Sequence, residues 1–411
     1  MTRSEANIKS IKTCRSCVSK KLVNVLSLGK QYLSDFVVTK DKPEKYPLVL
    51  VLCKNCSLLQ LRHTTPQSSL YTERYGYISG INQTMRDELK KIVEISSKKV
   101  KLNKNSLVVD IGANDGTLLS FYDDDYFRVG VEPIKKFAKE CKKYADVVVD
   151  DYFNFFSYSR KINNKKAYII TVISCFYDID DPNKFVSDIK RILHKDGIIV
   201  IQQNYLVGML KYNAFDNIVH EHLEYYSLLS LENLLNKYDL EIFDVELSDL
   251  NGGSFRTYIC HKARRSIKEN VPKLRSQEKK LKLNQKKIYQ DFASRVKKTR
   301  ENLHKLLIKL KKEEKSIYIY GASTRGNTLL QFCKIDHKLI KAAVERNSEK
   351  WGKRIASVGI PIISEEQARK DKPDYMLVLP WFFKEEFLKR ERAYLESGGH
   401  FIFPLPKPEI I

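Results

Sequence analysis

Two Cys-x-x-Cys pairs near the start of the 411-residue chain limit most strongly what its first segment can fold into. The first pair is Cys14 and Cys17, and the second is Cys53 and Cys56. Four thiolates in two such pairs suit one tetrahedral Zn²⁺, and because sulfur would fill every coordination position, the metal would be structural. Apolar runs at 48–52 and 58–61 flank the second pair, which predicts a β-hairpin with the cysteines at its turn. We expect a small zinc domain here; a redox-active disulfide pair is the alternative.

A glycine-rich turn follows an apolar run that ends at Asp110. The turn contains Gly112, Asn114, Asp115 and Gly116. These residues permit a tight turn and a close approach of the backbone to a ligand. The next predicted strand, 128–131, ends in Glu132, about 20 positions after Asp110, which is the usual offset of an acid that binds ribose hydroxyls. A third acidic position, Asp151 followed by Tyr152, comes after the apolar run 147–149.

Alternating strand and helix patterns continue through this part of the chain. Strands are predicted at 168–173 and 198–202, with a helix at about 182–193 between them. Such alternation predicts a parallel sheet flanked by helices, an α/β fold. The glycine spacing is not G-x-G-x-x-G. It resembles the S-adenosylmethionine (SAM) site of class I methyltransferases, which implies that the turn binds the methionine part, Glu132 the ribose, and Asp151 and Tyr152 the surroundings of the adenine. The alternative is a turn that only closes an α/β unit.

The segment 215–227 contains His220, Glu221 and His222 in succession. Histidine is the natural general base near neutral pH, and a neighbouring carboxylate can fix its tautomer. The spacing differs from H-E-x-x-H, so a catalytic zinc is not expected here. The alternative is a set of polar residues at the entrance of a helix.

The C-terminal part predicts a second α/β unit. A strand at 316–320 leads into a turn and a helix, and the turn contains Gly321, Arg325, Gly326 and Asn327. Amide groups at the start of a helix attract phosphate, and Arg325 adds a positive charge, so we expect these residues to bind the phosphates of a substrate. The alternative is a second packed α/β unit that binds no ligand. Further strands are predicted at 361–363, 375–379 and 400–403. Trp381 either covers a ligand or fills an interface between domains.

The chain as a whole resembles the sugar C-methyltransferases of deoxysugar biosynthesis. The pieces that carry this resemblance are the two cysteine pairs, 75–80 (YGYISG), 110–117 (DIGANDGT), 220–227 (HEHLEYYS), 252–256 (GGSFR), 320–322 (YGA), 326–328 (GNT), 345–347 (ERN), 372–375 (KPDY) and 379–381 (LPW). The resemblance implies an N-terminal zinc domain, a central SAM-dependent methyltransferase domain and a C-terminal Rossmann-like domain. We place these at 1–70, 71–262 and 316–411, with a basic helical connector at 263–315.

The resemblance also implies a reaction at carbon. The substrate would be a nucleotide-linked keto-deoxysugar, from which a base removes the proton next to the keto group before the enolate carbon takes the methyl group. His222 would be the base and Glu221 would orient it, whereas His220, Tyr75 and Tyr77 would line the sugar pocket and could stabilise the enolate oxygen.

Two residues depart from the family pattern: Val219 stands where a tyrosine is usual, and Asn251 where a histidine is usual. They leave open which sugar, and which atom of it, is methylated. Methyl transfer to oxygen or nitrogen of a related sugar is therefore a competing prediction, and a non-enzymatic zinc-stabilised protein is another.

The net charge of +23, from 73 Lys+Arg and 50 Asp+Glu, suggests different partners at first sight. An RNA methyltransferase would suit this charge, but the sequence lacks an RNP-like aromatic motif. Much of the excess lies in the region 263–315, where Leu303, Leu306, Leu307 and Leu310 predict an amphipathic helix with a solvated basic face.

Hydropathy argues against a membrane protein. The mean hydropathy is −0.40, and the longest nearly apolar stretch, 167–177, is shorter than the ~18–20 residues of a membrane span. The first residues contain no apolar segment typical of a secretory signal. We therefore expect a cytoplasmic enzyme whose partner is a small nucleotide sugar, with neither a membrane nor a nucleic acid as partner; the sequence leaves the oligomeric state open.

Overall fold

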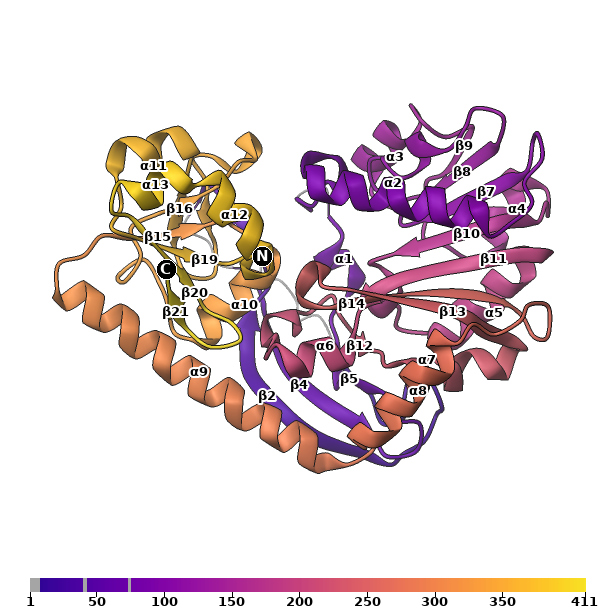
Figure 1. The fold of residues 1–411 in the computed structure, drawn as a ribbon, viewed down its shortest axis with the longest axis horizontal. Helices are drawn as coiled ribbons and strands as arrows, with labels where there is room; N and C mark the ends of the chain where they lie inside the picture. The colour runs from indigo at the N-terminus through magenta and orange to yellow at the C-terminus, as the bar shows by residue number, and fades with distance from the viewer. Residues whose placement is uncertain (1–7, 40–42, 73–74) are drawn as a thin grey trace, which may run out of the picture.

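Four β-sheets organise the chain in the computed structural model, which describes residues 8–39, 43–72 and 75–411. A seven-stranded sheet and an eight-stranded sheet form two separate lobes, and a long hairpin with one long helix joins them along one side (Figure 1). The hairpin is the N-terminal part of the chain. The N-terminal part therefore contacts both lobes and does not form a separate unit.

The central lobe is built on a mostly parallel sheet of order β13-β14-β11-β10-β7-β8-β9. Only β14 runs against its neighbours. The strands are β7 Leu107–Ile111, β8 Phe127–Val131, β9 Val147–Val149, β10 Ala167–Ile173, β11 Leu193–Asn204, β13 Leu240–Ser248 and β14 Ser254–His261. Every residue of β7 is buried, as expected for a central strand that is covered on both faces. This confirms the predicted α/β sheet.

Helices cover both faces of the central sheet and also lead into it. They are α2 Gln83–Lys98, α3 Lys135–Cys141, α4 Phe155–Ile162, α5 Pro182–Ile192, α6 Leu206–Lys211 and α7 Leu228–Leu235. Asp181 caps α5 by accepting a hydrogen bond from the Lys184 amide, and Pro182 follows at the first helical position, so this helix starts where the sequence predicts. Short 3-10 turns complete the lobe: η1 Ser79–Ile81, η2 Leu119–Phe121, η3 Phe176–Asp178, η4 Phe215–Asn217, η5 Asn236–Tyr238 and η6 Leu250–Gly252.

The N-terminal sheet has the order β12-β5-β4-β2, with β2 Leu22–Tyr32, β4 Lys45–Cys53, β5 Leu59–Leu61 and β12 Glu224–Tyr225. The second cysteine pair lies at the turn between β4 and β5, as predicted. A separate small ladder pairs β1 Lys9–Ser10 with β6 His63–Thr64, and α1 Gln67–Leu70 follows. Because β12 comes directly after the His-Glu-His residues and pairs with β5, that segment is anchored to the zinc domain.

The C-terminal lobe contains a parallel core of five strands: β15 Ile317–Tyr320, β16 Ala343–Val344, β18 Ile360–Ile363, β19 Tyr375–Val378 and β20 His400–Phe403. β17 Arg354–Ile355 and β21 Glu409–Ile410 extend it, and β3 Phe36–Val37 from the N-terminal part forms its edge. Its helices are α10 Thr324–Phe332, α11 Glu365–Asp371, α12 Lys384–Arg390 and α13 Arg392–Glu396, with turns η7 Ser348–Lys350 and η8 Trp381–Phe383. The predicted second α/β unit is confirmed, but it borrows a strand from residues near the N-terminus.

Two helices connect the lobes: α8 Asn270–Leu281 and the 27-residue α9 Lys286–Lys312. The helix α9 runs alongside β2 and the C-terminal lobe (Figure 1). Its buried apolar face includes Leu303, Leu307 and Leu310. The basic residues of α9 occupy the other face. Much of the net positive charge is therefore solvated surface. Within the described ranges, no helix is both long and apolar enough to cross a membrane.

Candidate functional site

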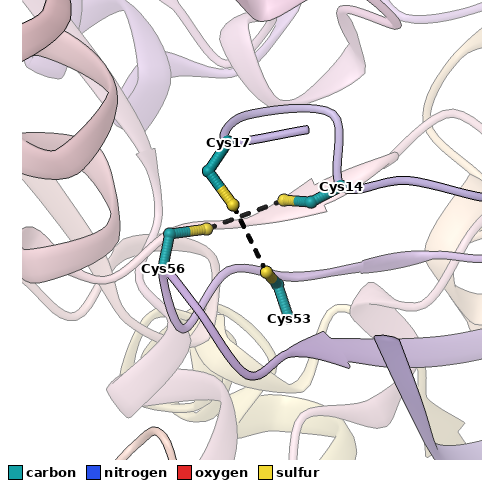
Figure 2. A group of neighbouring side chains, drawn as sticks. All are labelled: Cys14, Cys17, Cys53 and Cys56. Atoms are coloured by element: carbon teal, nitrogen blue, oxygen red, sulfur yellow. Dashed lines mark hydrogen bonds between the residues drawn. The ribbon is translucent and has the colours of Figure 1, made fainter. Parts of the chain in front are cut away.

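The four paired cysteines converge on one point, with all four sulfur atoms within 4.8 Å of one another. Figure 2 shows the two knuckles facing each other, with Sγ–Sγ distances of 3.6 Å for Cys14–Cys56 and 3.5 Å for Cys17–Cys53. These distances exceed a disulfide bond of about 2.05 Å, so the thiols are free. Four sulfur donors without a carboxylate or an open position fit a structural Zn²⁺.

The cysteine cluster is also held from outside. The Gln60 side chain donates a hydrogen bond from Nε2 to Cys14 Sγ at 3.2 Å, and its Oε1 accepts one from the Arg15 amide at 3.1 Å. Donors of this kind stabilise thiolate ligands. Gln60 lies on β5 opposite Glu224 of β12. The zinc cluster and the His-Glu-His segment therefore share one small sheet.

A cavity of about 340 Å³ opens at the carboxyl ends of β7 and β8. This is the edge at which parallel α/β sheets bind ligands. Among the residues predicted to bind the cofactor, those that line the cavity are Asp110, Gly112, Asn114, Glu132 and Tyr152. Several residues of the lining were not predicted, including Tyr71, Pro133, Phe153, Cys175 and Asp178.

Backbone geometry and buried carboxylates shape this cavity. Gly112 has a φ of +77°, and a Cβ there would lie 2.9 Å from Cys175 Sγ, so only glycine fits. Glu132 is 5% exposed and accepts hydrogen bonds from the Asn114 and Ile134 amides at 2.9 and 2.8 Å. Burial raises its pKa. The remaining lone pairs of its carboxylate suit the hydroxyls of a ribose.

Asp110 is 4% exposed and accepts a hydrogen bond of 2.6 Å from the Thr171 hydroxyl. Burial, reinforced by the charges of Glu132 and Asp115, raises the pKa of Asp110 to about 7. A cavity of about 340 Å³ that is lined by buried acids and by the aromatic Tyr152 and Phe153 lies in the size range of small-ligand sites. The cavity therefore fits SAM.

Three residues predicted to bind the cofactor lie outside the cavity lining. The Asp115 carboxylate accepts hydrogen bonds from the Gly80 amide at 2.9 Å and the Thr117 amide at 3.2 Å, so it fastens the 75–80 segment to the turn. Gly116 is needed for packing, because a Cβ there would lie 2.9 Å from Cys141 Cα. Asp151 is exposed and accepts a hydrogen bond from the adjacent Tyr152 amide.

The two histidines of the His-Glu-His segment have different surroundings. His220 is buried against β4, with Nε2 3.1 Å from the carbonyl oxygen of Tyr46. His222 has Nδ1 2.9 Å from the carbonyl oxygen of Asn217, and its ring lies edge-on to Tyr177 with the centroids 4.3 Å apart. A carbonyl only accepts, so Nδ1 of His222 carries the hydrogen and Nε2 keeps its lone pair.

Burial lowers the pKa of His222 to about 3, and the positive charge of Arg325 acts in the same direction. The ring is therefore neutral, with an unprotonated Nε2. A backbone carbonyl orients it, whereas the family pattern implied Glu221 for this role. Burial raises the pKa values of Tyr71, Tyr75 and Asp178, and the charge of Glu221 acts on each of them in the same direction.

Tyr75 and Tyr77, predicted to lie beside the substrate, both line the cavity. Tyr71 and Asp178 join them, and the Tyr71 hydroxyl donates to Asp178 Oδ2 at 3.0 Å. Asp178 follows β10 at the carboxyl end of a strand next to β7. The rule that ligands bind at such strand ends could have identified it from the sequence.

The predicted phosphate-binding turn makes contacts between domains. Arg325 donates from Nε and Nη2 to Asp216 Oδ2 at 3.1 and 2.8 Å, and from Nη1 to the Asn251 carbonyl at 2.7 Å. Trp381 Nε1 donates to the same Asp216 oxygen at 3.1 Å, so the tryptophan fills a domain interface.

The other predicted phosphate-binding residues of this turn also make contacts within the protein. Asn327 donates to the Ser34 hydroxyl at 2.8 Å and accepts a hydrogen bond from Ser357. Gly321, with φ +85°, and Gly326 leave room for Pro380 and Leu379. The charge of Arg325 is thus already neutralised by Asp216.

A second cavity of about 370 Å³ lies where the three parts of the chain meet. Its lining consists of Phe36, Val37, Val38, Thr39, Gly76, Lys136, Asn347, Glu349, Lys350 and Lys353. Lys136 donates to the Tyr75 carbonyl at 2.6 Å, and Lys350 donates to the Ala322 carbonyl at 2.9 Å. Lys350 also forms an ion pair of 3.2 Å with Glu345, which leaves it one hydrogen for a further acceptor, whereas Lys136 keeps two.

Three family models match successive parts of the chain. They are described as “Putative zinc binding domain” for residues 14–71, “Methyltransferase domain” for 77–245 and “C-methyltransferase C-terminal domain” for 249–406. A curated relative, the C-methyltransferase NovU of Streptomyces niveus, is 29% identical over 98% of this chain and 98% of its own length. These matches agree with the zinc-binding, methyltransferase and C-terminal regions inferred from the residues.

Solved structures show more distant likeness to part of the chain. A SAM-dependent methyltransferase from Clostridium acetobutylicum is 11% identical, covering 45% of this chain and 94% of its own, with a TM-score of 0.34. The mitomycin 7-O-methyltransferase MmcR is 17% identical, covering 46% of this chain and 56% of its own, with a TM-score of 0.35.

Proposed function

We propose that the chain is a SAM-dependent, zinc-containing C-methyltransferase and that its substrate is a nucleotide-linked keto-deoxysugar, methylated at the carbon next to the keto group. The observation that carries this proposal is the state of His222. A neutral imidazole with a free Nε2 lone pair lies beside Tyr177, whose neighbours Cys175 and Asp178 line the cofactor cavity. This placement suits removal of a carbon-bound proton next to the bound methyl donor.

In this mechanism Asp110, Gly112, Glu132 and Tyr152 would hold SAM, which would supply the methyl group. His222 Nε2 accepts the proton next to the keto group, and the electron pair of that C–H bond moves into the enolate. The imidazolium that forms is stabilised by the Asn217 carbonyl at Nδ1. The Tyr75 hydroxyl, which lines the same cavity, donates a hydrogen bond to the enolate oxygen.

The second cavity supports a nucleotide-linked substrate. Gly76 lines it, and the adjacent Tyr75 and Tyr77 line the cofactor cavity, so one loop separates the two spaces. A sugar beside the tyrosines would place its diphosphate toward Lys136, Lys350 and Lys353. Ammonium groups are effective point charges for phosphate. We therefore assign the diphosphate to this cavity, rather than to the turn at Arg325, which forms contacts between domains.

The two departures from the family pattern, Val219 and Asn251, both lie outside the lining of the cofactor cavity. Val219 is buried, and Asn251 adopts a left-handed backbone whose carbonyl binds Arg325. Neither position places a new nucleophile or base in the cavity lining. Methyl transfer to oxygen or nitrogen is the second candidate, and it predicts a product whose ring carbons keep their protons.

A panel of nucleotide keto-sugars incubated with SAM, followed by mass spectrometry, tests the substrate class. Exchange of the proton next to the keto group for deuterium, measured by NMR without SAM, tests the base. We expect His222→Ala to abolish exchange and methylation, and His194→Ala, which changes a histidine stacked on Tyr168 away from the cavity, to retain both. Exchange at the wild-type rate in His222→Ala would exclude this base.

A further inference from the structure

The carboxyl group of Asp178 is only half satisfied, although its residue lines the cofactor cavity. Its Oδ2 accepts a hydrogen bond of 3.0 Å from the Tyr71 hydroxyl. Its Oδ1 is buried and has no hydrogen-bond partner among the residues that the structure describes. A buried polar atom without a partner costs about 1–3 kcal/mol, so an unpartnered oxygen at a cavity points to a ligand that completes it.

The charges around Asp178 favour its neutral form. Glu221 and Glu224 are the charged groups that act on it, and both are acidic. Its other titratable neighbours are Cys175 and the phenols of Tyr71, Tyr75, Tyr177 and Tyr225, whose pKa values its charge raises. Burial is the largest cause that raises the pKa of Asp178 well above its usual value.

The position of Asp178 relative to the base is set by the 3-10 turn η3. Tyr177, which contacts the His222 ring, and Asp178 are consecutive residues of this turn. Tyr71 and Tyr75 approach from the segment that leads into α2. The acid thus lines the cavity, and the base, which is itself outside the lining, contacts the residue next to the acid in the chain. This is the arrangement that enolisation of a ketone requires, with a base at carbon and a donor at oxygen.

We propose that Asp178 carries a proton on Oδ1 and donates a hydrogen bond from it to the keto oxygen of the substrate while His222 removes the neighbouring proton. This rests on the proposed function. The C–H electron pair forms the new C=C bond, the carbonyl π pair moves to oxygen, and the departing proton is bound by Nε2 of His222. Tyr71 holds the carboxyl in place by donating to Oδ2. A neutral carboxylic acid paired with a tyrosine donor is an established form of oxyanion site.

Deuterium exchange next to the keto group, followed by NMR from pH 6 to 10 without the methyl donor, tests this role. Asp178→Asn keeps a donor that cannot ionise, whereas Asp178→Ala removes it. We expect Asp178→Ala to slow exchange roughly 10²–10³-fold, as for loss of one oxyanion donor. Asp178→Asn should keep most of the rate and lose the alkaline decline that the wild type shows, because only a protonated Asp178 donates and that form disappears as pH rises through its raised pKa.

Two controls make the outcome specific. Asp239→Asn alters an exposed carboxylate paired with Lys190 and should change neither rate nor pH profile. Calorimetric binding of S-adenosylhomocysteine to Asp178→Ala should match the wild type, showing that the cavity is intact. Tyr71→Phe should slow exchange less than Asp178→Ala, because it loosens the donor without removing it.

Three results would overturn the inference. If Asp178→Ala exchanged at the wild-type rate, no donor would be needed there. If Asp178→Asn were as slow as Asp178→Ala, a negative charge would be required instead, as for a cationic amino substituent on the sugar. If the wild-type protein exchanged no keto-sugar of the panel, the proposed function would fail and this role with it, whereas the first two results leave the proposed function standing.

Discussion

Replacing Asp216 by alanine would leave the Arg325 guanidinium in the domain interface without its anionic partner. The side chain of Asp216 is 1% exposed and that of Arg325 is 14% exposed, so water screens this pair weakly. Removing one partner of a buried pair costs about 3–5 kcal/mol. Arg325 keeps its hydrogen bond to the Asn251 carbonyl, so we expect the lower end, about 3 kcal/mol.

Urea unfolding followed by tryptophan fluorescence measures this loss directly. Both tryptophans, Trp351 and Trp381, lie in the C-terminal lobe, and Trp381 itself donates to Asp216. With a slope of about 2 kcal/mol per molar urea, a loss of about 3 kcal/mol lowers the midpoint by about 1.5 M. Asp249→Ala, which alters an exposed carboxylate nearby, should stay within about 0.5 kcal/mol of the wild type.

The double variant Asp216→Leu/Arg325→Met tests whether the loss of stability comes from an unpaired charge or from altered packing. Replacing both charges by apolar groups removes the unpaired ion and leaves Trp381 Nε1 without its acceptor, so the double variant should lose about 1 kcal/mol, clearly less than Asp216→Ala. A midpoint for Asp216→Ala within about 0.3 M of the wild type, or a double variant that loses the sum of the two single changes, would refute the reasoning. The ion pair would then contribute nothing to the joining of the lobes.

Three further predictions concern the two cavities and the metal, and a fourth concerns pH. Gly112→Val places a side chain on a left-handed backbone and against Cys175, so calorimetry should show at least roughly 100-fold weaker binding of S-adenosylhomocysteine, with unchanged circular dichroism. Lys353→Ala should weaken binding of a nucleoside diphosphate about 10-fold, and more at low salt, while SAM binding is retained; equal affinity would place the diphosphate elsewhere. Metal analysis should find one zinc per chain in the wild type and none in Cys14→Ser, which should also melt at lower temperature. The raised pKa of Asp110 means that its contribution to stability is complete below about pH 4 and declines as pH rises toward 7, so Asp110→Asn should flatten the pH dependence of cofactor-free unfolding in that window.

Local patterns in the sequence predicted the elements that depend on local causes. The hairpin around Cys53, the strand and turn at Asp110 and the α/β alternation all rest on short-range signals, and the structure contains each of them. The family models and the NovU relative agree with the zinc-binding and methyltransferase assignments. Such features need only the periodicity, the glycines and the cysteine spacing of one segment.

Local sequence patterns could not predict contacts between distant segments. Arg325 is a cation beside the start of a helix, which is typical of a phosphate site. Its actual partner, Asp216, is more than a hundred positions earlier in the chain. Likewise, the orientation of His222 depends on a backbone carbonyl, which no side-chain pattern records. Asp178 was missed because a single acid after a strand becomes notable only when its neighbours and its unpartnered oxygen are known.

The strand β3 makes the order of synthesis matter for this chain. Phe36 pairs with Ile355, a separation of 355 − 36 = 319 residues. At about 5–20 residues per second, a ribosome needs roughly 15–65 s to supply the partner strand after β3 emerges. During that time the zinc knuckles can close, but β3, which follows the opposite end of the β2–β4 hairpin, waits for the last lobe and offers unpaired backbone groups to other chains. Cutting the gene before the C-terminal lobe would make that delay permanent: β3 would lose its partner strand, and β17 would become the exposed edge of the C-terminal sheet.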